Sequence, residues 1–357
     1  MENLRGLILS GGAGTRLRPI THTSAKQLVP VANKPVLFYG IEALVAAGIK
    51  EIGIIIAPET GDEIRAAVGD GSAFGARITY IQQPEPKGLA HALLTAEEYL
   101  EDGPFVMYLG DNLLRDGITD LVERFRSDEP DALILLTRVP DPWHYGVAEL
   151  DGGTVVRLVE KPKDPPSDMA LVGVYMFGSR IFAAAKAIEP SGRGELEITD
   201  AIQKLIDESR SVESHTVSGW WKDTGQLADM LDANRLVLED LERRVDGELS
   251  EAKVEGRVYI EAGATVERST VRGPAIVGSG AVIRDAYVGP YTSIARDCAV
   301  ERCEVEHSIL LEGARVSDLG VRLEASLLGK NAKLARGDGV PKTLRMIVGD
   351  NSEIEIP

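Results

Sequence analysis

Short apolar runs alternate with amphipathic stretches over roughly the first 220 residues of the chain. The apolar runs have the length of buried strands, and the amphipathic stretches have the length of helices. Such alternation is typical of a layered α/β domain with a mainly parallel sheet. We expect strands at 6–9, 52–57, 78–82, 105–109 and 132–137, and helices at 36–47, 61–67, 89–100 and 226–242.

Beyond the last of these helices the pattern changes to a repeat of six residues. Small, aliphatic or β-branched side chains recur in register at Val258, Ala264, Thr270, Ile276, Val282, Val288, Ile294 and Val300. After a slip the period resumes at Leu310, Val316, Arg322, Leu328 and Leu334, with one charged exception. A hexapeptide period is the signature of a parallel β-helix. We expect a parallel (left-handed) β-helix, with a β-sandwich as the alternative.

The two patterns predict two domains, and 357 residues suffice for two hydrophobic cores. We place an α/β catalytic domain at 1–243 and a hexapeptide-repeat β-helix domain with a C-terminal tail at 244–357. The repeat is expected to be architectural and to promote a homo-oligomer through its apolar faces. Deletion of the residues after about 250 should then disturb assembly or stability more than chemistry.

Composition narrows the classes of partner. A formal net charge of −17 makes nucleic acid an unlikely ligand, because such ligands select for basic surfaces. No apolar run approaches the roughly 18 residues of a membrane helix, and the chain enters a core strand almost at once. We therefore expect no signal peptide and a cytoplasmic location. Cys298 and Cys303 have no histidine pattern nearby, so we interpret both as packing residues.

A glycine-rich turn follows the first expected strand and has the features of a polyphosphate site. Gly11, Gly12 and Gly14 let backbone N–H groups approach an anion, and Arg16 and Arg18 add charged donors. The Lys-Ser or Lys-Thr pair of a P-loop is missing, and a leucine stands where the dinucleotide fingerprint needs its third glycine. An ordinary glycine-rich turn is the remaining alternative.

This turn, together with 24–30 and 33–35, closely resembles the sugar-phosphate nucleotidylyltransferases, and within them the long form of the glucose-1-phosphate thymidylyltransferases. The resemblance covers about residues 4–225 and continues in order through blocks at 83–90, 109–112, 145–147, 160–162, 193–200 and 221–225. It implies a Rossmann-like nucleotidyltransferase domain. It also implies transfer of a nucleotidyl group from dTTP to α-D-glucose 1-phosphate, giving dTDP-glucose and pyrophosphate for deoxysugar or antibiotic biosynthesis.

The resemblance assigns a role to each charged residue of these blocks. Asp111 and Asp223 would hold Mg²⁺, a hard cation that prefers oxygen ligands. Arg16 and Lys26 would bind the triphosphate. Lys161 and Arg193 would bind the phosphate of the sugar. The catalytic set is therefore Arg16, Lys26, Asp111, Lys161 and Asp223. No general base is required, because the attacking phosphate is largely a dianion at neutral pH.

Binding residues follow from the same blocks. An amide such as that of Gln83 has the donor and acceptor needed to read a pyrimidine edge. The expected nucleotide-binding set is Gly11, Gly12, Gly14, Thr15, Arg16, Gln27, Gln83, Pro86, Gly88 and Asp111. The expected sugar-phosphate set is Tyr145, Gly146, Glu160, Lys161, Val172, Tyr175, Arg193 and Trp221.

Three departures from the shorter thymidylyltransferases keep other functions open. Lys87 replaces a residue that is often acidic, Lys222 replaces an apolar one, and the C-terminus is a repeat in place of a helical tail. Use of UTP or another sugar 1-phosphate is the enzymatic alternative, and a non-catalytic regulatory homologue is the second. A bifunctional protein with an acyltransferase β-helix is the third, with His307 as the only histidine of the repeat.

Overall fold

A computed structural model of the chain describes residues 4–12, 14–22, 24–337, 346, 348 and 350–355. The chain forms two compact units. Unit 1 consists of Met1–Ala13, Ser24–Leu28 and Val36–Asp223, and unit 2 of Gly14–Thr23, Val29–Pro35 and Thr224–Pro357. The expected boundary after residue 243 stays a prediction. Among the described residues, no helix has the length and apolar character needed to cross a membrane.

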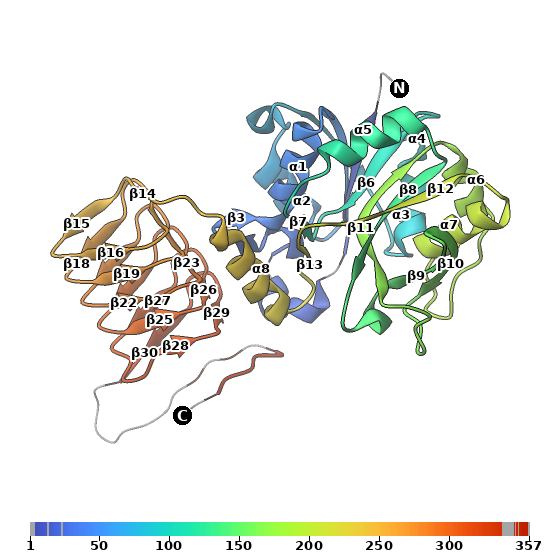
Figure 1. Ribbon diagram of the computed structural model, residues 1–357. Helices are drawn as coiled ribbons and strands as arrows, with labels where there is room; N and C mark the ends of the chain where they lie inside the picture. Colours follow the sequence, from blue (N-terminus) through green and yellow to red (C-terminus); the bar gives the residue numbers. More distant parts are fainter. Residues whose placement is uncertain are drawn as a thin grey trace. The chain divides into compact units, whose positions relative to one another are not determined.

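Unit 1 is built on a nine-stranded mixed sheet (Figure 1). Along its main path the order is β10-β9-β11-β6-β1-β4-β5, and β8 and β12 continue from β11. Strands β6, β1, β4 and β5 are parallel, whereas β11 is antiparallel to β6, β8 and β9. The strands are β1 (Arg5–Ser10), β4 (Glu51–Ile56), β5 (Arg77–Gln82), β6 (Phe105–Leu109), β8 (Ala132–Arg138), β9 (Gly146–Asp151), β10 (Thr154–Glu160), β11 (Met169–Phe177) and β12 (Val212–Thr216). The five expected strands are confirmed.

Helices cover the sheet because both of its faces are apolar. Along β1, Leu7 and Leu9 belong to one buried cluster and Ile8 to the other, as the alternation of side chains across a strand requires. The helices of unit 1 are α1 (Val36–Ala46), α2 (Gly61–Val68), α3 (Leu89–Thr95), α4 (Glu97–Leu100), α5 (Thr119–Asp128), α6 (Arg180–Lys186) and α7 (Ile198–Asp207). The helix expected at 89–100 is therefore divided at Ala96.

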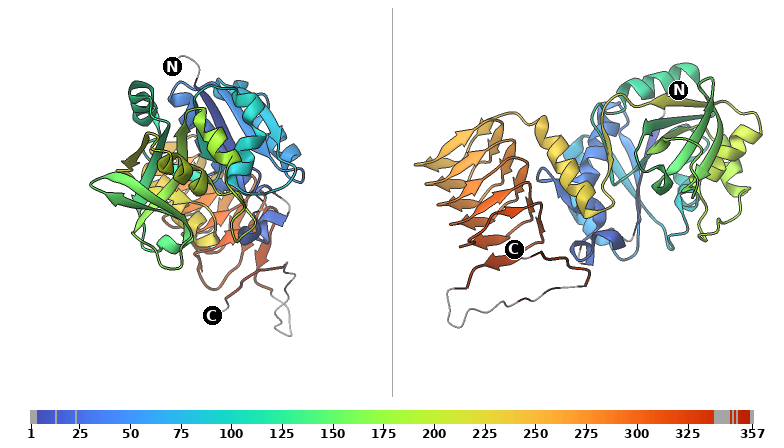
Figure 2. Two further views of the ribbon diagram at one scale, coloured as in Figure 1. Left: turned by 90° about the vertical axis from the view of Figure 1, so that its right-hand side faces the viewer. Right: turned by 60° about the horizontal axis from the view of Figure 1, so that its bottom comes forward.

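Unit 2 contains the expected parallel β-helix, whose coils stack in layers (Figure 2). Its first sheet contains β14 (Arg244–Val245), β17 (Val258–Ile260), β20 (Ala275–Val277), β23 (Thr292–Ile294), β26 (Ile309–Leu310) and β29 (Leu327–Leu328). Its second contains β15 (Glu248–Ser250), β18 (Thr265–Glu267), β21 (Val282–Arg284), β24 (Ala299–Glu301), β27 (Arg315–Ser317) and β30 (Lys333–Ala335). Its third contains β16 (Lys253–Glu255), β19 (Thr270–Arg272), β22 (Tyr287–Val288), β25 (Glu304–Glu306) and β28 (Leu323–Glu324).

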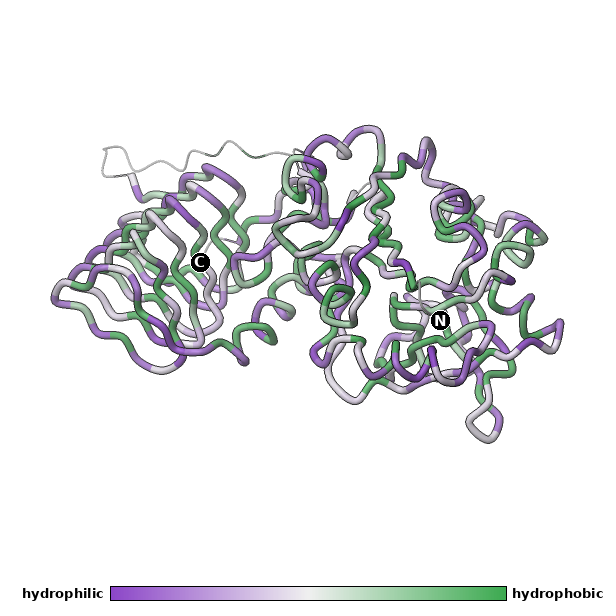
Figure 3. Tube along the Cα trace, turned by 90° about the horizontal axis from the view of Figure 1, so that it is seen from above, coloured by the Kyte–Doolittle hydropathy of each residue, from purple (hydrophilic) through white to green (hydrophobic). Residues whose placement is uncertain are grey.

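The length of a coil explains where the sixfold count departs from the structure. Val258 pairs with Ala275, and Ala275 pairs with Thr292, so successive coils here are 17 residues apart rather than 18. A strict count in sixes therefore drifts, and it selects Thr270 and Val282, which are only half-buried. Hydrophobic and hydrophilic residues alternate along each coil (Figure 3). The inward side chains are mostly valine, alanine and isoleucine.

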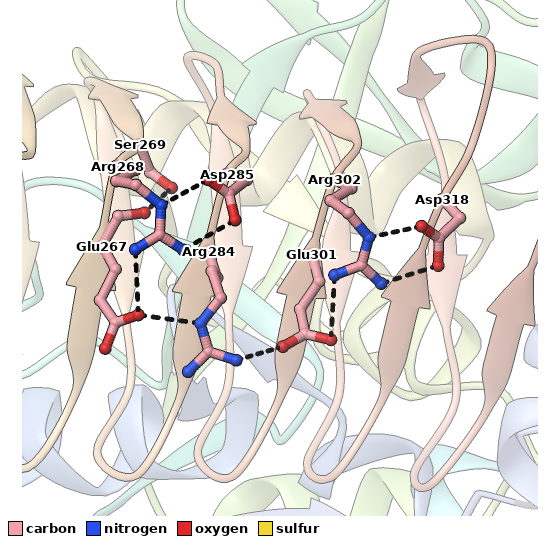
Figure 4. Close-up of polar contacts among 8 residues, drawn as sticks. All are labelled: Glu267, Arg268, Ser269, Arg284, Asp285, Glu301, Arg302 and Asp318. Atoms are coloured by element: carbon pink, nitrogen blue, oxygen red, sulfur yellow. Dashed lines mark hydrogen bonds and ion pairs between the residues drawn. The ribbon is translucent and has the colours of Figure 1, made fainter.

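Ion pairs connect successive coils along the second sheet (Figure 4). The Arg284 guanidinium lies between Glu267, 2.8 Å away, and Glu301, 2.9 Å away. On the adjoining turns, two further arginine–aspartate pairs each make two hydrogen bonds, Arg268 with Asp285 and Arg302 with Asp318. Parallel stacking places equivalent positions above one another, and the alternation of sign keeps like charges from facing each other.

A buried asparagine connects three segments of unit 2. Asn234 lies within α8 (Leu227–Glu239) and is 0% exposed. Its Oδ1 accepts hydrogen bonds from the Ala32 N–H at 2.9 Å and the Ser293 hydroxyl at 2.6 Å, and its Nδ2 donates to the Tyr291 carbonyl at 3.0 Å. Ala32 stands in the turn between β2 (Pro30–Val31) and β3 (Lys34–Pro35). The helix thus ties this hairpin to one coil of the β-helix.

Candidate active site

Two carboxylates and a lysine meet where β6 ends. Asp111 follows the strand after Gly110, and β7 (Asn112–Leu114) pairs with β13 (Trp221–Asp223) so that Asp223 stands opposite Asn112. The Lys26 ammonium forms a hydrogen bond with Asp111 Oδ2 and lies 3.7 Å from Asp223 Oδ1. Unit 1 thus brings together three of the residues that the sequence selected, from segments far apart in the chain.

The local charges hold Asp111 in its ionised form. Burial opposes ionisation, but the Lys26 ammonium and a hydrogen bond from Asn112 outweigh it, so the pKa of Asp111 lies below its ordinary value. Asn112 Nδ2 donates to Asp111 Oδ1 at 2.9 Å, which fixes the plane of the carboxylate. The Lys26 side chain is 8% exposed and Asp111 is 22% exposed. An ionised, oriented carboxylate is therefore available at neutral pH.

This donor set suits a hard divalent cation completed by a substrate. Asp111 and Asp223 supply oxygen ligands on one side of a common point, next to Lys26. Over the described residues, no group of three or more His, Cys, Asp or Glu side chains could hold a metal by itself. Mg²⁺ is commonly held by one or two carboxylates plus substrate phosphates. The residues present fit that arrangement.

Two glycines after β1 lie beside glutamine side chains. A Cβ on Gly11 would lie 3.0 Å from Gln83 Oε1, and one on Gly12 would lie 3.8 Å from Gln27 Nε2. Both glutamines are buried, Gln27 at 3% exposed and Gln83 at 6%. Part of the expected nucleotide-binding set is therefore assembled within unit 1.

The rest of the glycine-rich turn belongs to unit 2. Gly14 adopts a φ of 61°, which a residue without a Cβ takes without strain, and a short 3-10 helix follows at Thr15–Leu17. Thr21 Oγ1 donates to the Gly14 carbonyl at 2.7 Å and closes the turn. Arg16 is exposed on this helix, whereas Leu17 is buried. The phosphate roles of Gly14, Thr15 and Arg16 stay predictions.

The loop expected to bind the base runs from Gln83 to Gly88. Gly88 has a φ of 102°, and a Cβ there would lie 2.4 Å from the Leu196 carbonyl oxygen, so the position requires glycine. The Lys87 carbonyl accepts from the Leu196 N–H at 2.8 Å, and Ala90 N–H donates to the Leu196 carbonyl at 3.0 Å. Pro86 is exposed on this loop. The loop is therefore tied to the segment that carries Arg193.

Glu160 is the centre of the expected sugar-phosphate site. It ends β10 opposite Gly146, and a Cβ on Gly146 would lie 3.1 Å from Glu160 Oε2. Arg193 Nη1 lies 3.2 Å from Glu160 Oε1, and Lys161 Nζ lies 3.6 Å from the same oxygen. Thr199 Oγ1 donates to Glu160 Oε2 at 3.3 Å. The Lys161 ammonium and the Arg193 guanidinium thus lie next to the Glu160 carboxylate.

Arg193 also faces two further carboxylates. Its Nη2 lies 2.6 Å from Glu195 Oε2, and its Nε lies 3.7 Å from Glu197 Oε1. Burial lowers the pKa of Arg193, but Glu197, Glu195 and Glu160 together raise it above its ordinary value. The pKa of Glu197 is raised, chiefly because the side chain is buried at 3% exposed. The ion pairs with Glu195 and Glu197 thus hold the Arg193 guanidinium in place.

The aromatic rings of Trp221 and Tyr145 pack against each other, and the amide of Asn112 contacts Trp221. The Trp221 ring lies 5.3 Å from the Tyr145 ring, and its Nε1 donates to Asn112 Oδ1 at 2.6 Å. The same oxygen accepts from the Gly173 N–H at 3.1 Å, beside Val172, where the pairing of β11 with β8 is interrupted. Sequence reasoning missed Asn112 as a site residue, although it stands directly after Asp111 in the motif.

Tyr175 is a residue of the hydrophobic core. It is 4% exposed in the middle of β11, and its ring stacks on Phe177 at 5.8 Å within the hydrophobic core. Burial, with a smaller contribution from Glu160, raises its pKa above the ordinary value. Core packing accounts for this side chain, and its expected contact with the sugar stays a prediction.

Comparisons with known proteins agree with this geometry. The nucleotidyl transferase family model matches residues 5–240. A glucose-1-phosphate thymidylyltransferase of Streptomyces griseus is 54% identical over 355 residues, and one of Streptomyces antibioticus is 54% identical over 356, with 99% of both chains covered in each case. A solved structure from Bacillus anthracis, named for the same activity and in complex with sucrose, is 35% identical with a TM-score of 0.63, and covers 68% of this chain and 97% of its own. The chain therefore belongs to the nucleotidyl transferase family, and within it to the glucose-1-phosphate thymidylyltransferases.

Proposed function

We propose that this chain transfers a thymidylyl group from dTTP to α-D-glucose 1-phosphate, giving dTDP-glucose and pyrophosphate. The observation that carries the proposal is the convergence of Asp111 and Asp223 on Lys26 at the end of β6. Carboxylates beside a cation suit phosphoryl chemistry, in which positioning and charge neutralisation dominate catalysis. The names of the two Streptomyces relatives support the choice of substrates.

Lys26 in unit 1 and Arg16 in unit 2 are each proposed to act on the triphosphate. The Lys26 ammonium is held by carboxylates and is thereby placed to neutralise phosphate charge. Arg16, exposed on the 3-10 helix after Gly14, is proposed to stabilise the charge that develops on the α-phosphate and on departing pyrophosphate. These two cations act on the nucleotide and on the leaving group.

Glu160, Lys161 and Arg193 form the sugar-phosphate half. The two cations are proposed to take the phosphate, and the Glu160 carboxylate to accept hydrogen bonds from the sugar hydroxyls. Binding then exchanges the contacts of Arg193 and Lys161 with Glu160 for contacts with phosphate. The attacking group is a phosphate oxygen that is already ionised at neutral pH, so the chain has only to align it in line with the bond that breaks.

Enzymes of this family work with a divalent metal ion, and we propose Mg²⁺ held by Asp111 and Asp223. When bound, the ion supplies neutralisation of the negative charge that develops during the transfer. Replacement of one phosphoanhydride by another makes the reaction readily reversible. The cytoplasmic location and the homo-oligomer stay predictions.

UTP is the second candidate for the nucleotide. Thymine and uracil present the same edge to an amide such as that of Gln83, and they differ only in the 5-methyl group. A matrix of nucleoside triphosphates against sugar 1-phosphates, scored by pyrophosphate release and product mass, separates the candidates. We expect the highest turnover with dTTP and glucose 1-phosphate. Turnover confined to another pair would move the proposal to that pair, and none with any pair would overturn it.

A further inference from the structure

A histidine outside the expected site touches the residue proposed to read the base. His91 lies in the first turn of α3, and its Nδ1 is 2.9 Å from Gln83 Nε2. The Gln83 side chain is buried at 6% exposed. None of the motif blocks gave His91 a role. Its contact is with the amide of Gln83, which must have a defined orientation if it is to read the base.

The chemistry of the contact fixes which form of the imidazole is present. The nitrogen of a glutamine amide is always a donor, so His91 Nδ1 must be the acceptor and its proton must be on Nε2. Burial and the nearby Lys87 lower the pKa of His91, and Glu85 opposes them, so the neutral form is favoured. A neutral imidazole with an acceptor at Nδ1 matches the observed geometry.

The contact between His91 and Gln83 Nε2 also determines where the amide oxygen, Oε1, lies. With Nε2 turned to His91, Oε1 faces Gly11, where an added Cβ would stand only 3.0 Å away. An imidazolium, or the neutral imidazole with its proton on Nδ1, would face the amide nitrogen with a second donor. The amide would then turn over, and a donor would replace the acceptor beside the glycine-rich loop.

We propose that His91 is a positioning residue that holds the Gln83 amide in the orientation that selects thymine or uracil. The inference rests on the proposed function. Thymine and uracil carry a donor at N3, which an acceptor such as Oε1 binds, whereas cytosine carries an acceptor there. An amide fixed with its oxygen toward Gly11 and the glycine-rich loop therefore favours dTTP and UTP over dCTP. An amide that turns over without cost loses much of that preference.

Two substitutions at His91 test the inference. His91→Leu removes the acceptor and keeps an apolar side chain of comparable bulk, while His91→Gln restores an acceptor. We expect His91→Leu to lower the kcat/KM ratio of dTTP over dCTP about three- to tenfold, the contribution of one hydrogen bond between neutral groups. The loss should appear in the KM for dTTP, with kcat and the KM for glucose 1-phosphate unchanged. His91→Gln should restore the ratio.

Thr95→Val is the matched control. The Thr95 hydroxyl donates to the His91 backbone carbonyl at 2.9 Å, so the substitution removes a contact of His91 that does not involve the imidazole. It should leave the nucleotide ratio unchanged. An unchanged dTTP to dCTP ratio in His91→Leu, in a parent enzyme that uses dTTP, overturns the role of His91 and leaves the proposed function standing. Equal losses for both nucleotides and for the sugar phosphate, not rescued by His91→Gln, show a merely structural role and overturn it too. A parent without turnover on dTTP refutes the proposed function instead.

Discussion

Replacement of Asn234 by alanine tests how the hairpin at residues 30–35 is held. The substitution removes the acceptor of the Ala32 N–H, the acceptor of the Ser293 hydroxyl and the donor to the Tyr291 carbonyl. Two backbone groups and the buried Ser293 hydroxyl are left without this partner. Each such group costs about 1–3 kcal/mol, and the two backbone contacts are only partly buried, so we expect a total loss of about 3 kcal/mol.

Urea denaturation followed by far-UV circular dichroism measures this loss in the free energy of unfolding. Glu239→Ala in the same helix is the control, because it removes only a half-exposed pair with Arg235, 2.7 Å long. Such pairs contribute about 0.3–0.5 kcal/mol. A loss below about 1 kcal/mol in Asn234→Ala, or one no larger than that of the control, would refute the reasoning. The hairpin would then not depend on the buried amide.

Three further predictions concern the charges and the repeat. Arg16→Ala should lower kcat about a hundredfold while the KM for glucose 1-phosphate changes little, as steady-state kinetics with each substrate varied will show. Arg302→Met should lower the Tm by more at pH 7 than at pH 3, in calorimetric scans of both chains. The guanidinium holds the pKa of Asp318 below its ordinary 3.8, so the stabilisation is present above that pH and is lost as the pH falls through the folded value. Deletion of the residues after about 250 should reduce the oligomer, and sedimentation showing an unchanged assembly would contradict the architectural role of the repeat.

Much of the fold could be predicted because the hydrophobic pattern reports burial directly. The apolar runs around Leu7 and Ile54 became central parallel strands, buried on both faces. The hexapeptide period gave the β-helix, although its count drifted against coils of 17 residues, as the pairing of Val258 with Ala275 shows. The break at Ala96 was not predicted, because neither a glycine nor a proline marks it.

The site could be predicted only as far as the motifs extend. Asp111 and Asp223 were selected because their motif blocks are distinctive, and the pairing of β7 with β13 explains how they come close together. His91 and Asn234 carry no such signal. His91 contacts one residue of a neighbouring loop and Asn234 contacts three residues far away in the chain, and such contacts depend on tertiary packing that no local pattern reports. Asn112 was adjacent to a recognised residue and was still missed.

Turnover of the Asp111→Asn variant tests the central claim most directly. The substitution keeps the shape of the side chain and removes the negative charge beside Lys26. Pyrophosphate release would be measured for the parent chain and the variant with dTTP, glucose 1-phosphate and saturating Mg²⁺. We expect clear turnover of the parent and a loss of at least about a hundredfold in the variant. Near-normal release by Asp111→Asn would contradict the account, because the carboxylates would then not be the centre of the site.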